Sequence, residues 1–176
     1  MSIITEHSIT LNLELQKKDV DKKMPIFYNP IMASNRNISI LLLNSIHNTN
    51  LKIADPLAGS GIRTLRFLKE LTAGKIKEIA ANDIKENFPE YLKKNLITNN
   101  IKKKITVQNQ EASLFLLNQT GFDYIDLDPF GTPNPFLSSA IARISRDGIL
   151  AVTATDTAAL TGTYPKVTLR KYWATS

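Results

Sequence analysis

Residues 122–131, with the sequence FDYIDLDPFG, combine a strand with a chemically unusual turn at its end. The apolar run from Phe122 to Leu127 predicts a buried strand. The four residues that follow are an aspartate, a proline, a phenylalanine and a glycine. They place a carboxylate, backbone carbonyls and a flat stacking surface at the mouth of a sheet. Such a site suits a planar base that carries an exocyclic amine.

Strand and helix signals alternate on both sides of this stretch. Periodicity predicts strands over 52–55, 76–82, 105–108, 122–128 and 148–154. It predicts helices over 38–47, 62–71, 86–98, 112–118 and 135–145. This alternation is typical of an α/β fold with a Rossmann-like parallel sheet, whose ligands bind beyond the carboxyl ends of the strands. Acids lie at or just beyond the carboxyl ends of all five strands: Asp55, Asp83, Glu111, Asp128 and Asp156.

Length and composition indicate one ordinary globular domain. The chain has 176 residues, 43% hydrophobic and 22% charged. Its net charge of +6 favours a polyanionic partner such as RNA, and it fits a solvated basic surface equally well. The absence of cysteine and the presence of only two histidines exclude disulfides, a cysteine nucleophile and Cys- or His-rich metal sites. Without an apolar run that could span a membrane or a signal-peptide pattern, a cytoplasmic protein is expected.

The two ends of the chain differ from the alternating middle. Residues 1–36 are predicted to form an irregular arm, in which alternating apolar residues over 8–15 allow a short hairpin. Residues 37–176 are predicted to form the α/β domain. A sheet of this kind usually continues with two more strands beyond Gly162, so the sequence is expected to be a fragment with the C-terminal strands truncated.

A glycine-rich turn follows the first predicted strand. Asp55 precedes Gly59 and Gly61, and glycines at a strand-to-helix turn let the backbone approach a ligand closely. The third glycine of a dinucleotide fingerprint is absent, and an acid before the turn suits the cationic methionine end of S-adenosylmethionine. Asp83 could then accept from the ribose hydroxyls, and Glu111 with Ala112 could hold the adenine. Each acid alone is as readily a helix cap or a solvated loop residue.

Asp128 is the candidate catalytic residue. An exocyclic amine is a poor nucleophile, and a carboxylate can accept its hydrogen bond and later its proton. The Pro129 carbonyl offers a second acceptor, and Phe130 could stack on a base flipped out of its helix. A plain strand-ending turn with a core aromatic is the alternative. Asp126, two residues earlier on the strand, is expected to be buried support.

The chain resembles the tRNA guanine-26 N2-dimethyltransferases, the Trm1 family, in its archaeal type. The resemblance rests on segments spread over nearly the whole chain: FYNPIM at 27–32, Asn35-Arg36, DPLAGSGIR at 55–63, DLDPFGTP at 126–133, AVTATDT at 151–157 and LRKY at 169–172.

The resemblance implies a class I methyltransferase fold with S-adenosylmethionine as donor. It implies methylation of guanine N2 at position 26 of tRNA, once and then again. It assigns Arg36, Arg63, Asp83, Glu111 and Ala112 to the cofactor. It assigns Asp128 to the amine, with Phe27 and Phe130 sandwiching the guanine.

The chain departs from the family pattern at Asn37 and Glu111, where the family usually has Asp, and near Trp173, where it usually has Gly. The resemblance also implies a C-terminal domain that helps to grip tRNA, and these 176 residues are expected to be the catalytic part without it. Two alternatives therefore stay open. One is an amine methyltransferase that acts on another base. The other is a non-catalytic or partner-dependent RNA-binding fragment that uses a basic face including Lys102–Lys104 and Arg170.

Overall fold

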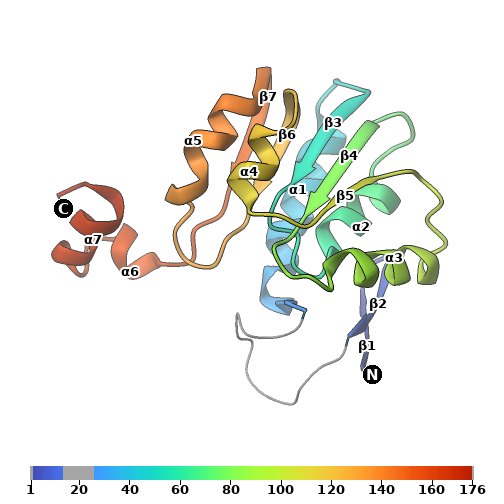
Figure 1. Cartoon of the computed structure of the whole chain (residues 1–176), viewed down its shortest axis with the longest axis horizontal. Helices are drawn as coiled ribbons and strands as arrows, with labels where there is room; N and C mark the ends of the chain where they lie inside the picture. Colours follow the sequence, from blue (N-terminus) through green and yellow to red (C-terminus); the bar gives the residue numbers. More distant parts are fainter. Residues whose placement is uncertain (1, 14–25, 176) are drawn as a thin grey trace.

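A five-stranded parallel sheet forms the centre of the molecule (Figure 1). The computed structural model describes residues 2–13 and 26–175. The strand order is β5-β4-β3-β6-β7. The strands are β3 (Leu51–Asp55), β4 (Ile76–Asn82), β5 (Thr106–Gln108), β6 (Phe122–Leu127) and β7 (Ile144–Val152). The order reverses between β3 and β6, and this switch point opens a crevice at their carboxyl ends.

Helices cover both faces of the sheet, which confirms the predicted Rossmann-like α/β class. On one face, α1 (Ala33–Ser45) and α2 (Ile62–Glu70) pack on side chains such as Ile53 and Tyr124. The other face is covered by α4 and α5, which pack on the alternate residues of the same strands, such as Ile125. The bounds of these two helices are Ala112–Leu117 and Asn134–Arg143.

The N-terminal residues are more regular than predicted. β1 (Ser2–Glu6) and β2 (Ile9–Leu13) form an antiparallel hairpin that packs on α2 and α3 (Phe88–Thr98). Ile9 and Leu11 are completely buried in the core beside Phe88 and Leu92. The prediction of an irregular arm is therefore wrong for these residues, and the hairpin begins earlier than the expected 8–15. The part of the arm at 14–25 lies outside the described residues.

Two asparagines of α3 hold the hairpin in place. The backbone N–H of Thr10 donates to Asn99 Oδ1 at 2.8 Å, and that of Asn12 donates to Asn95 Oδ1 at 3.0 Å. Without these bonds, the two backbone N–H groups of the edge strand would have no hydrogen-bond partner after folding. Two residues of β2 are thus bound to α3.

Two boundaries differ from the predictions for local reasons. α1 begins at Ala33 rather than at 38, because the short helix η1 (Pro30–Met32) leads directly into it, with the Asn29 side chain accepting from the Ile31 N–H at 3.0 Å. β7 begins at Ile144, earlier than expected, because Ile144 already pairs with Phe122 before a register shift.

Beyond β7 the chain forms two short helices, α6 (Thr157–Leu160) and α7 (Pro165–Tyr172), at the end of the molecule marked C in Figure 1. Asp156 anchors α7 by pairing with Lys171 Nζ at 3.0 Å and accepting a hydrogen bond from the Tyr172 hydroxyl at 2.5 Å. Among the described residues, no helix combines the length and the apolar character that crossing a membrane requires.

Candidate functional site

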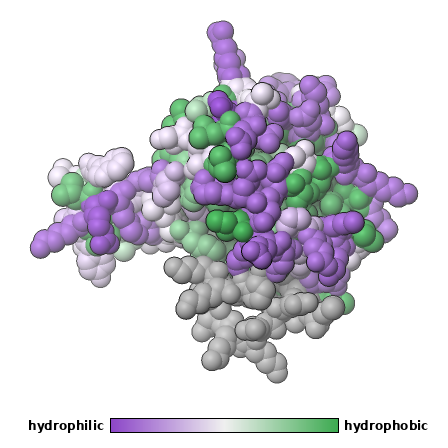
Figure 2. All heavy atoms as spheres, viewed as in Figure 1, coloured by the Kyte–Doolittle hydropathy of each residue, from purple (hydrophilic) through white to green (hydrophobic). Residues whose placement is uncertain are grey.

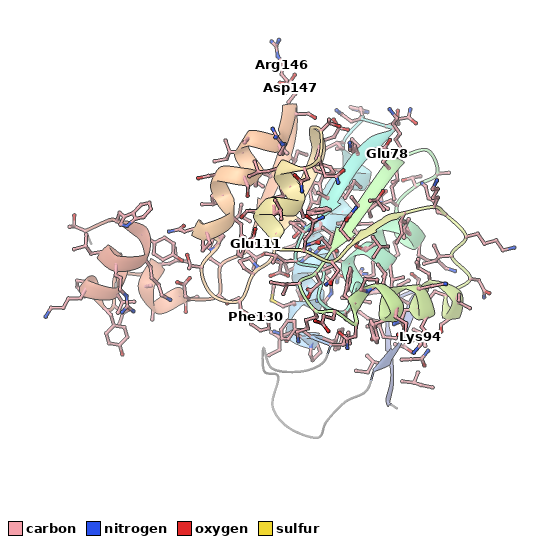
Figure 3. All side chains as sticks on the ribbon, viewed as in Figure 1. Glu78, Lys94, Glu111, Phe130, Arg146 and Asp147 are labelled. Atoms are coloured by element: carbon pink, nitrogen blue, oxygen red, sulfur yellow. The ribbon has the colours of Figure 1, made fainter. Side chains whose placement is uncertain are left out.

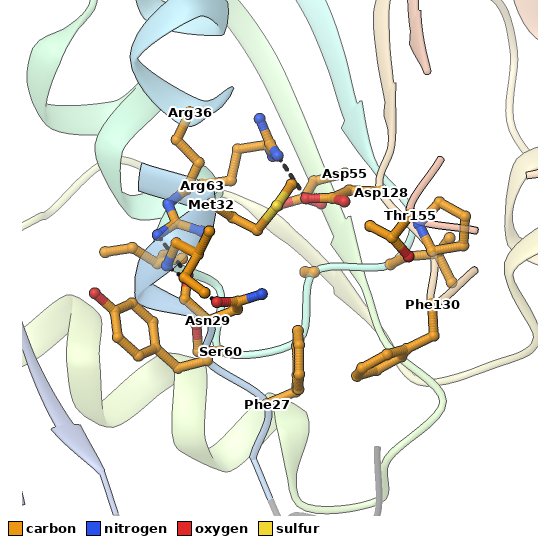
Figure 4. A pocket seen from close by; sticks show the side chains of 17 residues that line it. Phe27, Asn29, Met32, Arg36, Asp55, Ser60, Arg63, Asp128, Phe130 and Thr155 are labelled. Atoms are coloured by element: carbon orange, nitrogen blue, oxygen red, sulfur yellow. Dashed lines mark hydrogen bonds and ion pairs between the residues drawn. The ribbon is translucent and has the colours of Figure 1, made fainter. Parts of the chain in front are cut away.

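A cavity of about 280 Å³ lies at the carboxyl ends of β3 and β6. Four segments line it: the stretch 27–36, the turn 55–63, the turn 128–130 and Thr155. Figure 4 shows Phe27 and Phe130 side by side, with the carboxylates of Asp55 and Asp128 deeper in the site. The opposite, amino-terminal end of β7 carries Arg146 and Asp147, far from Phe130 in Figure 3.

The turn after β3 brings backbone close to the cavity. Gly59 and Gly61 have φ values of +55° and +70°, which glycine adopts without strain. A Cβ on Gly59 would lie 3.0 Å from the Phe27 carbonyl oxygen, so the turn packs directly against the segment that carries Phe27. Gly59 lines the cavity, whereas Gly61 lies behind it and faces Leu92.

Asp55 is a buried carboxylate in the wall of the cavity. It accepts a hydrogen bond from the Thr64 hydroxyl at 2.7 Å. Burial raises the pKa of Asp55 to about 7, although the charge of Arg63 and the bond from Thr64 act in the opposite direction. A cationic ligand group in the cavity would favour its ionised form.

Asp83 supports the glycine turn from outside the cavity lining. Its Oδ2 accepts from the Gly59 N–H at 2.8 Å, and its Oδ1 accepts from the Lys85 N–H at 3.0 Å. Glu111 is the N-cap of α4 and accepts from the Leu114 N–H at 2.8 Å. Burial alone would raise the pKa of Glu111, but hydrogen bonds from the Ser113 and Leu114 backbone lower it. Ala112 is buried beside it.

Asp128 is held by Arg63. Arg63 Nη2 donates to Asp128 Oδ2 at 2.7 Å, and Arg63 Nη1 lies 3.1 Å from Asp126 Oδ2. Burial alone would lower the pKa of Arg63, but the charges of the two aspartates raise it. The arginine therefore stays charged between them and fixes the direction of the Asp128 carboxylate.

Asp126 supports this pair from inside the core. It is 2% exposed, and its Oδ2 accepts from the Tyr124 hydroxyl at 2.7 Å and from the Ser39 hydroxyl at 3.2 Å. Burial raises the pKa of Asp126, while the charge of Arg63 opposes the rise. The expectation that Asp126 is buried support agrees with this geometry.

Phe27 and Phe130 touch each other. Their ring centroids lie 4.1 Å apart with an interplanar angle of 65°. A base stacked between two rings needs about 7 Å between them, because carbon atoms in contact are about 3.5 Å apart. The two predicted stacking residues thus come together, but in this structure no slot for a base is open between them. Pro129, which precedes Phe130 in the same turn, is buried.

The turn 128–131 is tied to the segment after β7. The Gly131 N–H donates to Thr155 Oγ1 at 2.9 Å, and the Thr155 N–H donates to the Gly131 carbonyl at 3.0 Å. Thr155 was not among the predicted site residues, although its place after the fifth strand is a signal that could have found it.

Arg36 lies in the cavity wall, where it is buried and paired with Glu6 of β1. Its Nε donates to Glu6 Oε1 at 2.8 Å, and its Nη2 donates to the Asn29 carbonyl at 3.0 Å.

Of the predicted site residues, eight line the cavity: Phe27, Arg36, Asp55, Gly59, Arg63, Asp128, Pro129 and Phe130. Four do not: Gly61, Asp83, Glu111 and Ala112.

The sequence model of the family described as N2,N2-dimethylguanosine tRNA methyltransferase matches residues 5–176. The chain belongs to this family. It is 43% identical over 180 residues to the tRNA (guanine(26)-N(2)/guanine(27)-N(2))-dimethyltransferase of Aquifex aeolicus, a match that covers 99% of this chain and 45% of that protein. It is 41% identical to the tRNA (guanine(26)-N(2))-dimethyltransferase of Methanothermobacter thermautotrophicus, over 98% of this chain and 45% of the relative. The chain therefore spans less than half the length of these two curated relatives.

Solved structures place this family member among the methyltransferases. The structure of Trm1 from Pyrococcus horikoshii with S-adenosyl-L-methionine is 33% identical and superposes with a TM-score of 0.86, covering 99% of this chain and 48% of that one. Trm5b from Pyrococcus abyssi is 19% identical with a TM-score of 0.67, over 85% of this chain and 39% of that one, and shares the fold alone. The predicted family and methyltransferase fold are confirmed.

In this family member the structure adds residues that the sequence did not single out for a role. Asn35 Oδ1 accepts from Arg63 Nη2 at 2.7 Å, and Asn35 Nδ2 donates to Thr153 Oγ1 at 3.2 Å, so α1 braces the arginine that holds Asp128. Tyr28 and Met32 line the cavity. The partners of Asn35 lie 28 and 118 positions away along the chain, so its role cannot be read from sequence spacing.

Proposed function

We propose that this protein transfers methyl groups from S-adenosylmethionine to the exocyclic N2 of guanine 26 in tRNA, giving N2-methyl- and then N2,N2-dimethylguanosine. The observation that carries the proposal is the Asp128 carboxylate, fixed by Arg63 at 2.7 Å in a cavity whose mouth is formed by Phe27 and Phe130. The names of the two relatives, which specify guanine N2 of tRNA, support the substrate.

The residues of the cavity fit S-adenosylmethionine. Gly59 packs so tightly on the Phe27 carbonyl that a Cβ would fill the space, which leaves backbone rather than side chain facing a ligand. Asp55 and Arg36 offer an anion and a cation for the ammonium and carboxylate of its methionine end. Asp83 and Glu111, after the next two strands, are assigned to the ribose and the adenine. When bound, this donor supplies an electrophilic methyl group on a sulfonium.

Asp128 aligns the amine and removes its proton. Its Oδ2 is held by Arg63, and within the described chain Oδ1 has no recorded partner, so it can accept a hydrogen bond from the guanine amine. When the nitrogen bonded to the methyl carbon, the sulfur of the donor would keep the electron pair of the broken carbon–sulfur bond. The nitrogen then carries a positive charge, and Asp128 takes the proton that neutralises it. Correct positioning can contribute up to about 7–11 kcal/mol to such a step.

Two parts of the chain share this work in the proposal. Residues 37–176 form the methyltransferase domain, and residues 1–36 contribute Phe27, Tyr28 and Arg36 to the site. The net charge of +6 supports a polyanionic substrate such as tRNA. We propose the cytoplasm as the place where this protein meets its tRNA.

The test uses the full-length protein and two tRNA transcripts that differ only in the base at position 26. The first carries guanosine at position 26, and the second carries inosine there, which lacks the N2 amine but keeps the rest of the base. We expect methyl incorporation into the first and none at position 26 of the second, with mass spectrometry locating the modified nucleoside. Methylation of the inosine transcript at another amine, or RNA binding without turnover at saturating donor, would contradict the proposal.

A further inference from the structure

Glu6, at the end of β1, is a buried carboxylate that is not among the predicted site residues. Its side chain is 5% exposed. It receives hydrogen bonds from Arg36, from Arg66 Nη1 at 3.1 Å and from the Tyr28 hydroxyl at 2.9 Å. Since Arg36 donates through both Nε and Nη2, these partners fill the roughly four acceptor positions of a carboxylate. Burial alone would raise the pKa of Glu6, but the bonds and charge of Arg36 lower it, so the group is ionised.

Two of the partners of Glu6 belong to the wall of the candidate site. Arg36 and Tyr28 both line the cavity, and the Arg36 guanidinium also lies 5.5 Å from the centre of the Tyr28 ring. Tyr28 is the neighbour of Phe27 in the chain. A residue of the N-terminal hairpin therefore fixes one face of the cavity without itself lining it.

The direction of the Arg36 guanidinium follows from these bonds. Glu6 and the Asn29 carbonyl occupy Nε and Nη2. Within the part of the chain that the structure describes, the two N–H donors of Nη1 have no recorded partner. A planar guanidinium anchored along one edge presents its remaining donors in a fixed direction, which suits a carboxylate. Figure 4 shows Arg36 on the same side of the cavity as Arg63 and Met32, which also line it.

The two arginines that share Glu6 differ in how much they depend on it. Arg66 is also paired with Glu70 Oε2 at 2.7 Å, so it keeps an anionic partner when Glu6 is neutralised. For Arg36, Glu6 is the one carboxylate recorded among the described residues. A buried charge that loses its partner is strongly destabilised and moves toward any other anion or water.

We propose that Glu6 is a positioning residue for the methyl donor: it holds Arg36 so that Nη1 meets the donor's carboxylate. The proposal rests on the proposed function, because it takes S-adenosylmethionine as the ligand of the cavity. It makes the N-terminal hairpin a working part of the cofactor site.

The experiment compares Glu6→Gln with Glu70→Gln in the full-length protein. Both substitutions remove one anion from Arg66, but only the first removes the anion from Arg36. Glu6→Gln also replaces one of the two oxygens that accept from Arg36, Arg66 and Tyr28 by an amide nitrogen that donates. Isothermal titration measures the affinity for S-adenosylmethionine, and steady-state kinetics separate KM from kcat. We expect Glu6→Gln to weaken donor affinity and raise the donor KM by about tenfold or more, with kcat at saturating donor within about twofold. Glu70→Gln should change neither by more than about twofold.

A second comparison shows whether Glu6 acts through Arg36. In an Arg36→Met background, Glu6→Gln should cause no further loss of donor affinity, as coupled residues are non-additive. Equal losses in both backgrounds, or wild-type donor affinity in Glu6→Gln, would overturn the proposal.

Two other results, a Glu6→Gln variant that does not fold and an unsubstituted protein that does not bind the donor, also have defined consequences. If Glu6→Gln does not fold, Glu6→Asp takes its place, and a folded Glu6→Asp with wild-type donor affinity overturns the proposal. If the unsubstituted protein does not bind S-adenosylmethionine, the proposed function itself fails, which is distinct from a normal wild type with a normal Glu6→Gln.

Discussion

Asp55 carries the clearest pH signature of any single residue in the site. Burial raises its pKa to about 7, so the free protein holds Asp55 largely protonated below neutrality. A carboxyl whose pKa rises on folding stabilises the fold below its ordinary pKa of 3.8, and that contribution is lost as pH rises toward 7. Ionised Asp55 is the form that would pair with the ammonium of the methyl donor.

The raised pKa of Asp55 predicts how the affinity for the methyl donor changes with pH. Below pH 7 the association constant should rise with pH at up to about tenfold per unit, and it should level off above, because binding requires the ionised carboxylate. Calorimetric titrations across this range measure the slope. Asp55→Asn should bind more weakly and without this slope. A slope that persists in Asp55→Asn would assign the titration to another group.

At the scale of the elements, replacing Gly61 by alanine is expected to destabilise the protein more than replacing Gly74. A Cβ on Gly61 would lie 2.6 Å from Leu92 Cδ1, whereas one on Gly74 would meet nothing within 4 Å, and both residues have positive φ. Gly74→Ala should therefore cost about 1–2 kcal/mol from backbone strain alone. Gly61→Ala adds overpacking between α2 and α3, for a total of about 2–5 kcal/mol.

Denaturant unfolding of the two variants measures this difference directly. Equal losses of unfolding free energy would contradict the prediction, because they would show that α3 shifts to accommodate the added methyl group at residue 61 without further cost.

The contact between Phe27 and Phe130 predicts that the two rings move apart when a base enters the site. The rings are 4.1 Å apart and must separate by about 3 Å or more to admit a base between them. Phe130→Leu, which keeps an apolar side chain but loses the aromatic face, should weaken productive tRNA binding by about 1–3 kcal/mol. Phe130→Tyr should remain near wild type. The ratio kcat/KM for tRNA measures both effects.

An unchanged kcat/KM in Phe130→Leu would remove Phe130 from the base slot and leave its contact with Phe27 as packing alone. Donor affinity provides the internal control, because it should stay the same in both variants.

At the scale of the whole molecule, charge distinguishes the two proposed ligands. Lysine and arginine together number 22 against 16 acids, and Figure 2 shows hydrophilic residues over much of the face in view. Binding of a polyanion releases counterions, so its affinity falls steeply with salt. Raising salt from about 50 mM to about 200 mM should weaken tRNA binding by at least about tenfold. Donor affinity should change by less than about threefold over the same range, because its charges pair inside the cavity.

Filter binding for tRNA and calorimetry for the donor measure these two responses on the same preparation. A tRNA affinity that ignores salt would count against a basic RNA-binding surface on this protein.

The sequence predicted the parallel sheet, the edge of it where ligands bind and most of the residues of the cavity, all from local patterns. An apolar run such as 122–127 and the glycine turn at 59–61 are visible in a short window, and topology then brings their ends together. The role of the hairpin was not predictable in this way. Glu6 meets partners 22, 30 and 60 positions away, and a lone glutamate in an alternating strand has no pattern that reveals burial.

The closed Phe27–Phe130 contact was also beyond sequence reasoning. The family resemblance named both residues as a sandwich for guanine, and the structure brings them together, but it sets them edge to face with no space between. Side-chain packing, rather than chain topology, decides this geometry.

The central claim is that Asp128, aimed by Arg63, activates an amine that attacks a methyl group held in the adjoining cavity. The most direct measurement is the single-turnover rate of methyl transfer to guanosine-26 tRNA by full-length Asp128→Asn, with donor affinity determined in parallel. The account predicts a rate lower by about 10²–10⁴-fold, with donor affinity within about threefold of the unsubstituted protein. A rate close to that of the unsubstituted protein, or a loss of donor binding as large as the loss of rate, would contradict it.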